Sequence, residues 1–186
     1  MKSKIILEEM QISKLLLHEH SKKQTMKIVR FVGGDQKKFD ALMKLCLGKD
    51  VLLAQRASWP LGYCVELHPE MMKMHLKKML KFIRGAQHPA IRRNFVKIMS
   101  LVHILPSLES ESISVCFDLL RTKSEFVAIR VYAMYYLESC CKKYPDLWIE
   151  LIATIQSESD NEKPAFKAGA KMVVLNYRKF KIKNQI

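Results

Sequence analysis

Residues 128–137 read Ala-Ile-Arg-Val-Tyr-Ala-Met-Tyr-Tyr-Leu, so nine apolar or aromatic residues surround one arginine, Arg130. A lone charge in such a run either binds a ligand or holds the fold together. It must also be paired or reach solvent with its head, because an unpaired charge among apolar neighbours is costly. The role of Arg130 therefore decides how this stretch is interpreted.

The stretch is one copy of an internal repeat. Residues 129–135, Ile-Arg-Val-Tyr-Ala-Met-Tyr, superpose on Gln-Arg-Ala-Ser-Trp-Pro-Leu at 55–61 and on Phe-Lys-Ala-Gly-Ala-Lys-Met at 166–172. The basic residues at 56, 130 and 167 are separated by 74 and 37 positions, which are two periods and one period of 37 residues. The missing copy is Ile-Arg-Arg-Asn-Phe-Val-Lys at 91–97, with Arg92 or Arg93 in the equivalent place. A fixed period of this length is typical of helical-repeat proteins.

Local signals within each period predict a pair of helices and no sheet. Apolar residues recur at helical spacing in 71–84 and 89–105. Gly33 and Gly34 indicate a helix end, followed by Asp35 as the next cap. Six positions before each repeated basic residue stands a residue of a type that caps helices: Asp50, Ser124 and Asn161. Gln87 occupies the same place in the remaining copy and fits this type less well. We divide the chain into repeats at 3–32, 33–68, 69–105, 106–144 and 145–179, followed by a basic tail at 180–186.

The order of an apolar helix, a capped turn and then an arginine before small and apolar residues resembles the HEAT and armadillo-like repeats. The copies that carry the resemblance run from Asp50 to Arg56, from Ser124 through Val-Ala-Ile-Arg130 to Leu137, and from Asn161 through Lys167 to Ala170. The resemblance implies an all-α fold, a right-handed α-α superhelix of about five helix pairs forming a single domain over residues 1–186. It also implies that the repeated basic residue is structural and binds polar groups in a neighbouring turn. The implied ladder consists of Arg56, Arg92, Arg93, Arg130 and Lys167.

Charge is distributed unevenly along the chain, whose formal net charge is +14. Residues 1–105 hold 20 Lys and Arg against 8 Asp and Glu, whereas residues 106–186 hold 12 against 10. This asymmetry favours association with acidic proteins, nucleic acid or anionic surfaces, and it is equally compatible with a solubilising surface that has no specific partner.

In proteins of the resembled type, the second helix of each pair lines the concave side. Here those helices are expected near 22–32, 51–67, 90–105, 125–141 and 164–179. Pro60 lies inside the second of them and predicts a kink beside Trp59. The candidate concave-face binding residues occupy their non-core positions: Lys23, Lys27, Arg30, Trp59, Tyr63, Arg92, Arg93, Lys97, His103, Lys171 and Arg178.

These residues predict a non-enzymatic protein-binding or scaffolding module, with an acidic protein or peptide as partner. The alternative is a nucleic-acid-binding protein related to the HEAT-like alkylpurine DNA glycosylases. That family uses an aspartate among aromatic residues on its concave helices, and the expected second helices here contain no interior Asp. The alternative therefore predicts nucleic-acid binding without catalysis. A third reading is a structural partner within a larger assembly.

Other classes of site lack their motifs. The sequence has no H-E-x-x-H, no C-x-x-C and no Gly-rich phosphate loop, so we predict neither a metal nor a cofactor. The five cysteines are predicted to be buried free thiols in a reducing cytoplasm. No apolar run is long enough to span a membrane, and the first residues lack a secretory signal. The predicted location is cytoplasmic, and the sequence leaves the oligomeric state open.

Overall fold

The computed structural model describes residues 2–85, 88–159 and 162–184, and every regular element within those ranges is a helix. The predicted all-α fold is therefore confirmed. Contacts between residues group the chain into two compact units, unit 1 (Met1–Leu105) and unit 2 (Pro106–Ile186). The division coincides with the predicted boundary between the third and fourth repeats. That the whole chain forms a single domain stays a prediction.

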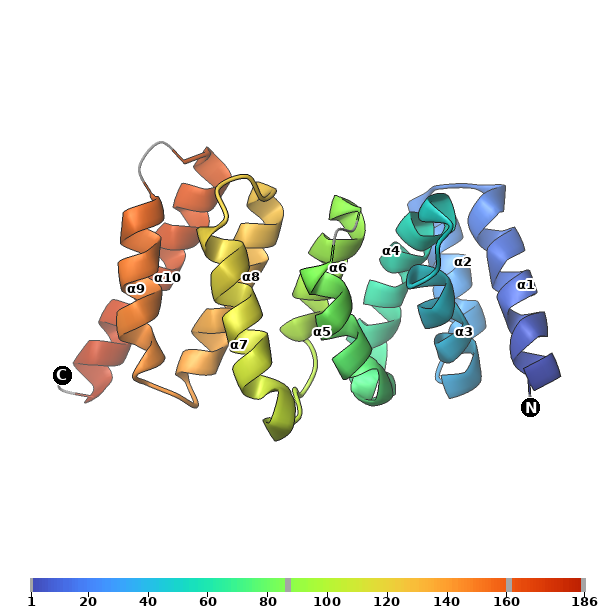
Figure 1. Cartoon of the computed structure of the whole chain (residues 1–186), viewed down its shortest axis with the longest axis horizontal. Helices are drawn as coiled ribbons and strands as arrows, with labels where there is room; N and C mark the ends of the chain where they lie inside the picture. Colours follow the sequence, from blue (N-terminus) through green and yellow to red (C-terminus); the bar gives the residue numbers. More distant parts are fainter. Residues whose placement is uncertain (1, 86–87, 160–161, 185–186) are drawn as a thin grey trace. The chain divides into compact units, whose positions relative to one another are not determined.

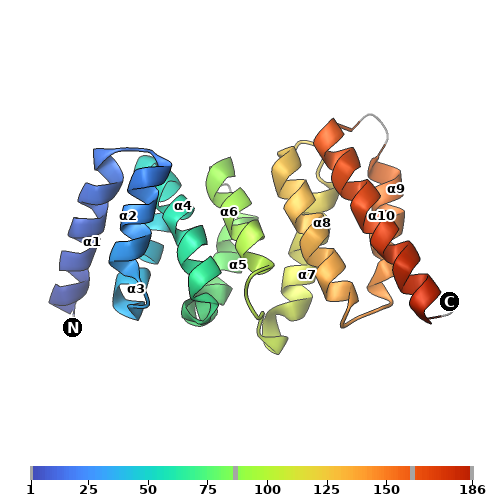
Figure 2. The same ribbon diagram turned by 180° about the vertical axis from the view of Figure 1, so that it is seen from behind.

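Unit 1 is built from successive helix pairs (Figure 1). The second helices α2, α4 and α6 pack side by side, and they lie in front in the reverse view (Figure 2). The pairs lie close to the predicted ranges 3–32, 33–68 and 69–105, with α1 beginning one residue earlier, and the repeat bounds stay a prediction. The elements of this unit are α1 (Lys2–His18), α2 (Lys22–Val32), α3 (Gln36–Cys46), α4 (Val51–Leu67), the 3₁₀ helix η1 (Pro69–His75), α5 (Leu76–Arg84) and α6 (Pro89–Met99).

Unit 2 repeats the arrangement with two helix pairs in its described residues. In Figure 1, α7 and α9 lie in front of α8 and α10, and Figure 2 shows the opposite side. Helix α8 packs against α7, α9 and α10. The elements are α7 (Pro106–Arg121), α8 (Val127–Cys141), α9 (Leu147–Glu158) and α10 (Pro164–Asn184).

Several helix ends lie where the cap residues predict. Asp35 and Asp50 are the N-caps of α3 and α4, and their carboxylates accept hydrogen bonds from backbone amides of the first turns. Gly33 ends α2 with a φ of +52°, a conformation that favours glycine. The predictions for these ends are confirmed. Helix α8 differs, because it begins after Phe126, whose amide donates to the side chain of Glu125, so Ser124 is not its cap. The predicted caps Gln87 and Asn161 lie outside the described residues.

Three elements depart from their predicted lengths. Residues 69–75 form a 3₁₀ helix, and the side chain of Gln36 donates to the carbonyl of Met71 at 3.1 Å, occupying an acceptor that an α-helix would use. Helix α6 ends at Met99 in tight turns, with Leu101 donating to Ile98, although its pattern predicts a helix through residue 105. Helix α10 continues to Asn184, so most of the predicted tail at 180–186 is helical.

Close packing of α10 on α8 depends on one glycine. A Cβ atom at Gly169 would lie 3.3 Å from Val131 Cγ1 and 3.4 Å from the Tyr135 hydroxyl. A larger residue would therefore force the two helices apart or shift both neighbours.

In the described parts of the chain, none of the helices combines the length and the apolar character needed to cross a lipid bilayer.

Candidate functional site

Arg130 is buried at the centre of an ionic network in unit 2. Its side chain is 1% exposed, and its guanidinium donates to the Leu120 carbonyl at 2.9 Å and to Glu158 at 3.1 Å. It also forms an ion pair with Glu162 and lies over the Phe166 ring, 4.6 Å from the centroid. The guanidinium thus joins the end of α7 to both sides of the turn between α9 and α10. This is the behaviour of a structural group, because every face of the charge is occupied by protein.

The other members of the predicted ladder occupy different environments. Arg56 on α4 donates to the carbonyls of Leu16 at 3.0 Å and Leu17 at 3.3 Å, at the end of α1 in the preceding repeat. Arg92 on α6 donates to the Gly85 carbonyl at 2.6 Å, within its own repeat. Arg93 and Lys167 are exposed. Arg56, Arg92 and Arg130 thus make the kind of contact that a structural role requires, and the ladder of five residues stays a prediction.

The second-helix face of unit 1 is the first candidate binding surface. We define it as the exposed side of α2, α4 and α6. Lys23, Lys27 and Arg30 project from α2 at successive helical turns, and all three are exposed. Arg93 is the exposed cation of α6. Glu66, the only acidic residue in the three helices, is bound to Lys97 at 2.6 Å, so its charge is already neutralised.

Aromatic side chains lie between these cations along the chain. Trp59 and Tyr63 are half-buried on α4, and the Trp59 ring lies 5.5 Å from the His20 ring. Pro60 is buried within α4, which runs from Val51 to Leu67 with the proline inside it. The neighbouring Ser58 accepts a hydrogen bond from Asn94 at 2.9 Å, which ties α6 to α4. His103 is exposed in the segment after α6, outside any helix.

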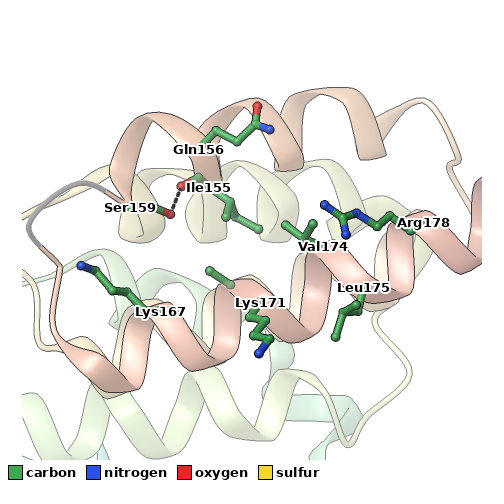
Figure 3. Close-up of a pocket in the computed structure, with 9 residues that line it drawn as sticks. Ile155, Gln156, Ser159, Lys167, Lys171, Val174, Leu175 and Arg178 are labelled. Atoms are coloured by element: carbon green, nitrogen blue, oxygen red, sulfur yellow. Dashed lines mark hydrogen bonds between the residues drawn. The ribbon is translucent and has the colours of Figure 1, made fainter.

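The second candidate surface is a groove between α9 and α10 in unit 2 (Figure 3). Its volume is about 530 Å³. The side chains of Val174 and Leu175 contribute apolar surface beside the buried Ile155, and the lining holds three cations, Lys167, Lys171 and Arg178. Among the described residues that line it, none is acidic. The structure thus places Lys171 and Arg178, predicted as binding residues, together with the ladder residue Lys167 in one groove.

A family model for the HEAT repeat domain matches residues 12–177. The chain is a member of the HEAT repeat family. No curated protein and no solved structure matched it in the corresponding searches. The predicted resemblance to HEAT repeats is therefore confirmed over most of the chain.

The cysteines of this HEAT repeat protein are poor nucleophiles. Burial raises the pKa of the Cys64 thiol and of the Cys141 thiol from 9.0 to about 12 in each case. Burial also raises the pKa of Cys46, Cys116 and Cys140. Thiols with such values stay protonated at neutral pH, and the thiolate is the reactive form. Among the described residues, no group of three or more His, Cys, Asp and Glu side chains is placed to hold a metal ion.

Sequence reasoning missed two kinds of residue in this HEAT repeat protein. Glu158 and Glu162, the partners of Arg130, stand on either side of a turn and carry no motif of their own. The groove residues Val174 and Leu175 fit the apolar pattern of any helix, so their position in an open groove leaves no separate signal. A repeat alignment that compares Lys171 with its equivalent Met134 would have marked this surface, because a cation replaces a core residue there.

Proposed function

We propose that this HEAT repeat protein is a binding module whose second-helix face in unit 1 receives an acidic segment of a partner protein. Membership of the family supports an interaction role, since helical repeats present extended surfaces to partners. The observation that carries the proposal is the charge of that face. Lys23, Lys27, Arg30 and Arg93 are exposed across α2 and α6, while the one acid of the three helices is bound to Lys97.

The chemistry of the face fits a polypeptide carrying Asp and Glu. Exposed cations raise the local concentration of an acidic segment and set its orientation, while the half-buried rings of Trp59 and Tyr63 add apolar contact area. Nucleic acid offers a similar charge but a regular array of phosphates, and its binding would fall steeply with salt. The nucleic-acid alternative stays a prediction that the same experiment tests.

The test is fluorescence anisotropy with a labelled Glu-rich 16-residue peptide that also contains two leucines. The variant carries Lys23→Glu, Lys27→Glu and Arg93→Glu, which are exposed positions on α2 and α6. Arg92 and Lys97 are left unchanged, because they bind Gly85 and Glu66 and their reversal would disturb the fold. We expect the variant to bind at least about tenfold more weakly than the native chain, because three attractive charges become repulsive.

The matched control carries Lys77→Glu, Lys78→Glu and Lys81→Glu on α5, an equal change of charge at exposed positions outside the second-helix face. It should bind the peptide within about threefold of the native chain, since distant surface charges are screened at physiological salt. Equal weakening by both triple variants would reject the proposal in favour of non-specific attraction. Displacement of the peptide by equimolar duplex or single-stranded DNA, with a steep salt slope, would favour the nucleic-acid alternative.

A further inference from the structure

The groove between α9 and α10 occupies the position that a following repeat covers elsewhere in unit 2. Adding the period of 37 to the α8 residues Arg130, Met134 and Cys141 gives Lys167, Lys171 and Arg178 on α10. The α8 residues are 1%, 0% and 0% exposed, because α9 and α10 pack against α8. Their α10 equivalents are exposed and line the groove. The same stripe of the repeat is thus a buried packing surface in α8 and an open one in α10.

Two observations distinguish this open stripe from a surface that is merely polar. An exposed isoleucine continues it at helical spacing, Ile182 at 80% exposure on α10, and α9 carries another, Ile149 at 72%. Within the described part of the chain, the charged residues that line the groove are all cations. A surface adapted only for solubility has no need of exposed isoleucines or of a single sign of charge. The groove therefore keeps apolar contact area and presents a positive rim.

We propose that this groove docks an amphipathic helix of a partner protein, with an apolar stripe facing Val174 and Leu175 and acidic residues facing Lys167, Lys171 and Arg178. From Lys167 to Arg178 the groove follows α10 for about 16 Å, which matches three turns of a bound helix. Helices commonly bind such grooves through residues at positions i, i+3 or i+4, and i+7. This site is separate from the second-helix face of unit 1.

A second copy of the chain is a poorer occupant. Helix α1 does expose apolar side chains, including Ile6, Leu7 and Met10. Its acids cannot meet the cationic rim, however, because Glu8 is buried and Glu9 is ion-paired with Lys44. The net charge of +14 also opposes self-association. Charge complementarity therefore selects an acidic helix from another protein.

The probe is a fluorescein-labelled 18-residue helical peptide with leucines at positions 4, 8, 11 and 15 and glutamates beside them. A peptide of the same composition with the leucines dispersed is the second probe. We expect micromolar binding of the first peptide to the full chain and at least about fivefold weaker binding of the second, since only a continuous stripe fits the groove. Equal binding of both peptides, or no binding of the first at 100 µM protein, would overturn the proposal.

Variants locate the site. The double variant with Lys171→Glu and Arg178→Glu should bind the first peptide at least about tenfold more weakly than the native chain. Leu175→Asp should also lower the affinity, because it places a charge on the apolar side of the groove. The control pair Lys179→Glu and Lys183→Glu changes the same charge on the same helix outside the groove, and should leave affinity within about twofold. Equal loss in the control pair would overturn the proposal. Sedimentation that shows a dimer broken by Leu175→Asp would overturn it in favour of a second copy.

The unit 1 variant with Lys23→Glu, Lys27→Glu and Arg93→Glu separates the two proposals. It should leave binding of the amphipathic peptide to the groove unchanged within about twofold, because its charges lie on other helices. Loss of peptide binding in this variant but not in the Lys171 and Arg178 pair would reject the groove and leave the second-helix face in place.

Discussion

Arg56 in unit 1 and Arg130 in unit 2 stand two repeat periods apart. They bind partners that lie in opposite directions along the sequence. Arg56 is half-buried and reaches back to the carbonyls that end α1. Arg130 is buried and reaches forward to Glu158 and Glu162 beside the next turn. The repeat therefore fixes where a cation stands, whereas the neighbouring helices decide which groups it binds and how strongly.

The difference in partners implies a difference in energy. Arg56 replaces water at two carbonyls that remain near solvent, so its net contribution is that of a charged hydrogen bond. Arg130 neutralises two carboxylates whose side chains are only 13% and 12% exposed. Removing one partner of a buried ionic group leaves the other charges without compensation. The comparison predicts a graded series of losses along the ladder.

The largest loss is expected for Arg130→Ala. We predict that the free energy of unfolding of unit 2 falls by about 3–5 kcal/mol, because Glu158 and Glu162 stay buried without their cation. Urea unfolding followed by Trp148 fluorescence in a Trp59→Phe background would report on unit 2 alone, since the chain has 2 tryptophans. Arg130→Lys should give a smaller loss, because it keeps the charge but not the planar fork. A loss of about 2 kcal/mol or less for Arg130→Ala, no larger than the value of a charged hydrogen bond, would remove the distinction between the two arginines.

Arg56→Ala should cost about 2 kcal/mol in unit 1, the value of hydrogen bonds from a charged donor. Urea unfolding monitored by circular dichroism measures this loss. Hydrogen exchange should also quicken at the end of α1, near Leu16 and Leu17, where the carbonyls lose their donor. Faster exchange spread evenly over the unit would contradict a local capping role.

Alkaline pH distinguishes the contribution of an arginine to stability from that of a buried thiol on the same helix. Cys64 lies on α4 with a pKa of about 12, against 9.0 ordinarily, so the unfolded chain releases its proton first as pH rises. The stability due to this protonated thiol is complete below pH 9 and is lost between pH 9 and about 12. At pH 10 the native chain should be less stable on account of Cys64 by on the order of 1 kcal/mol.

The control for the pH effect is Cys64→Ala, in which that part of the alkaline loss should vanish. The stability difference between the native chain and Arg56→Ala should not change between pH 8 and pH 10, since arginine stays charged throughout. A pH-dependent difference for Arg56→Ala would show that the cation and the thiol are coupled.

The smallest effect is expected at the last position of the ladder. Lys167→Ala should change the free energy of unfolding of unit 2 by less than about 0.5 kcal/mol, because the side chain is exposed. The same substitution should lower the affinity of the groove for the amphipathic peptide, as measured by fluorescence anisotropy. A stability loss close to that of Arg130→Ala would mean that Lys167 is a structural member of the ladder after all.

Much of the fold could be predicted because it depends on local patterns. The period of 37 residues, the apolar stripes and the caps Asp35 and Asp50 placed the helix pairs in their repeats. The 3₁₀ helix η1 could not be predicted, because the apolar spacing over 71–84 is that of one α-helix, and the hydrogen bond from Gln36 of α3 to the Met71 carbonyl joins residues 35 positions apart. The end of α6 at Met99 was also missed, since its apolar spacing continues beyond the helix.

The candidate site was predictable only in part. The sequence identified Lys171 and Arg178 as exposed cations of a second helix, but it did not reveal that they share a groove with Ile155 of α9. The sequence predicts Arg92 and Lys97 as binding residues. In the structure Arg92 donates to the Gly85 carbonyl, and Lys97 is ion-paired with Glu66. Side-chain pairing across 31 residues, as for Lys97 and Glu66, depends on packing that no single stretch encodes.

The reach of Arg56 has a consequence for the speed of folding. Its bond to Leu16 spans 40 positions, about one repeat, and that of Arg130 to Glu162 spans 32. Contacts this close in sequence need only short loops to close, so the entropy lost before each contact forms is small. Each helix pair can then serve as a template for the next, and folding within each unit can grow by single repeats from any starting pair.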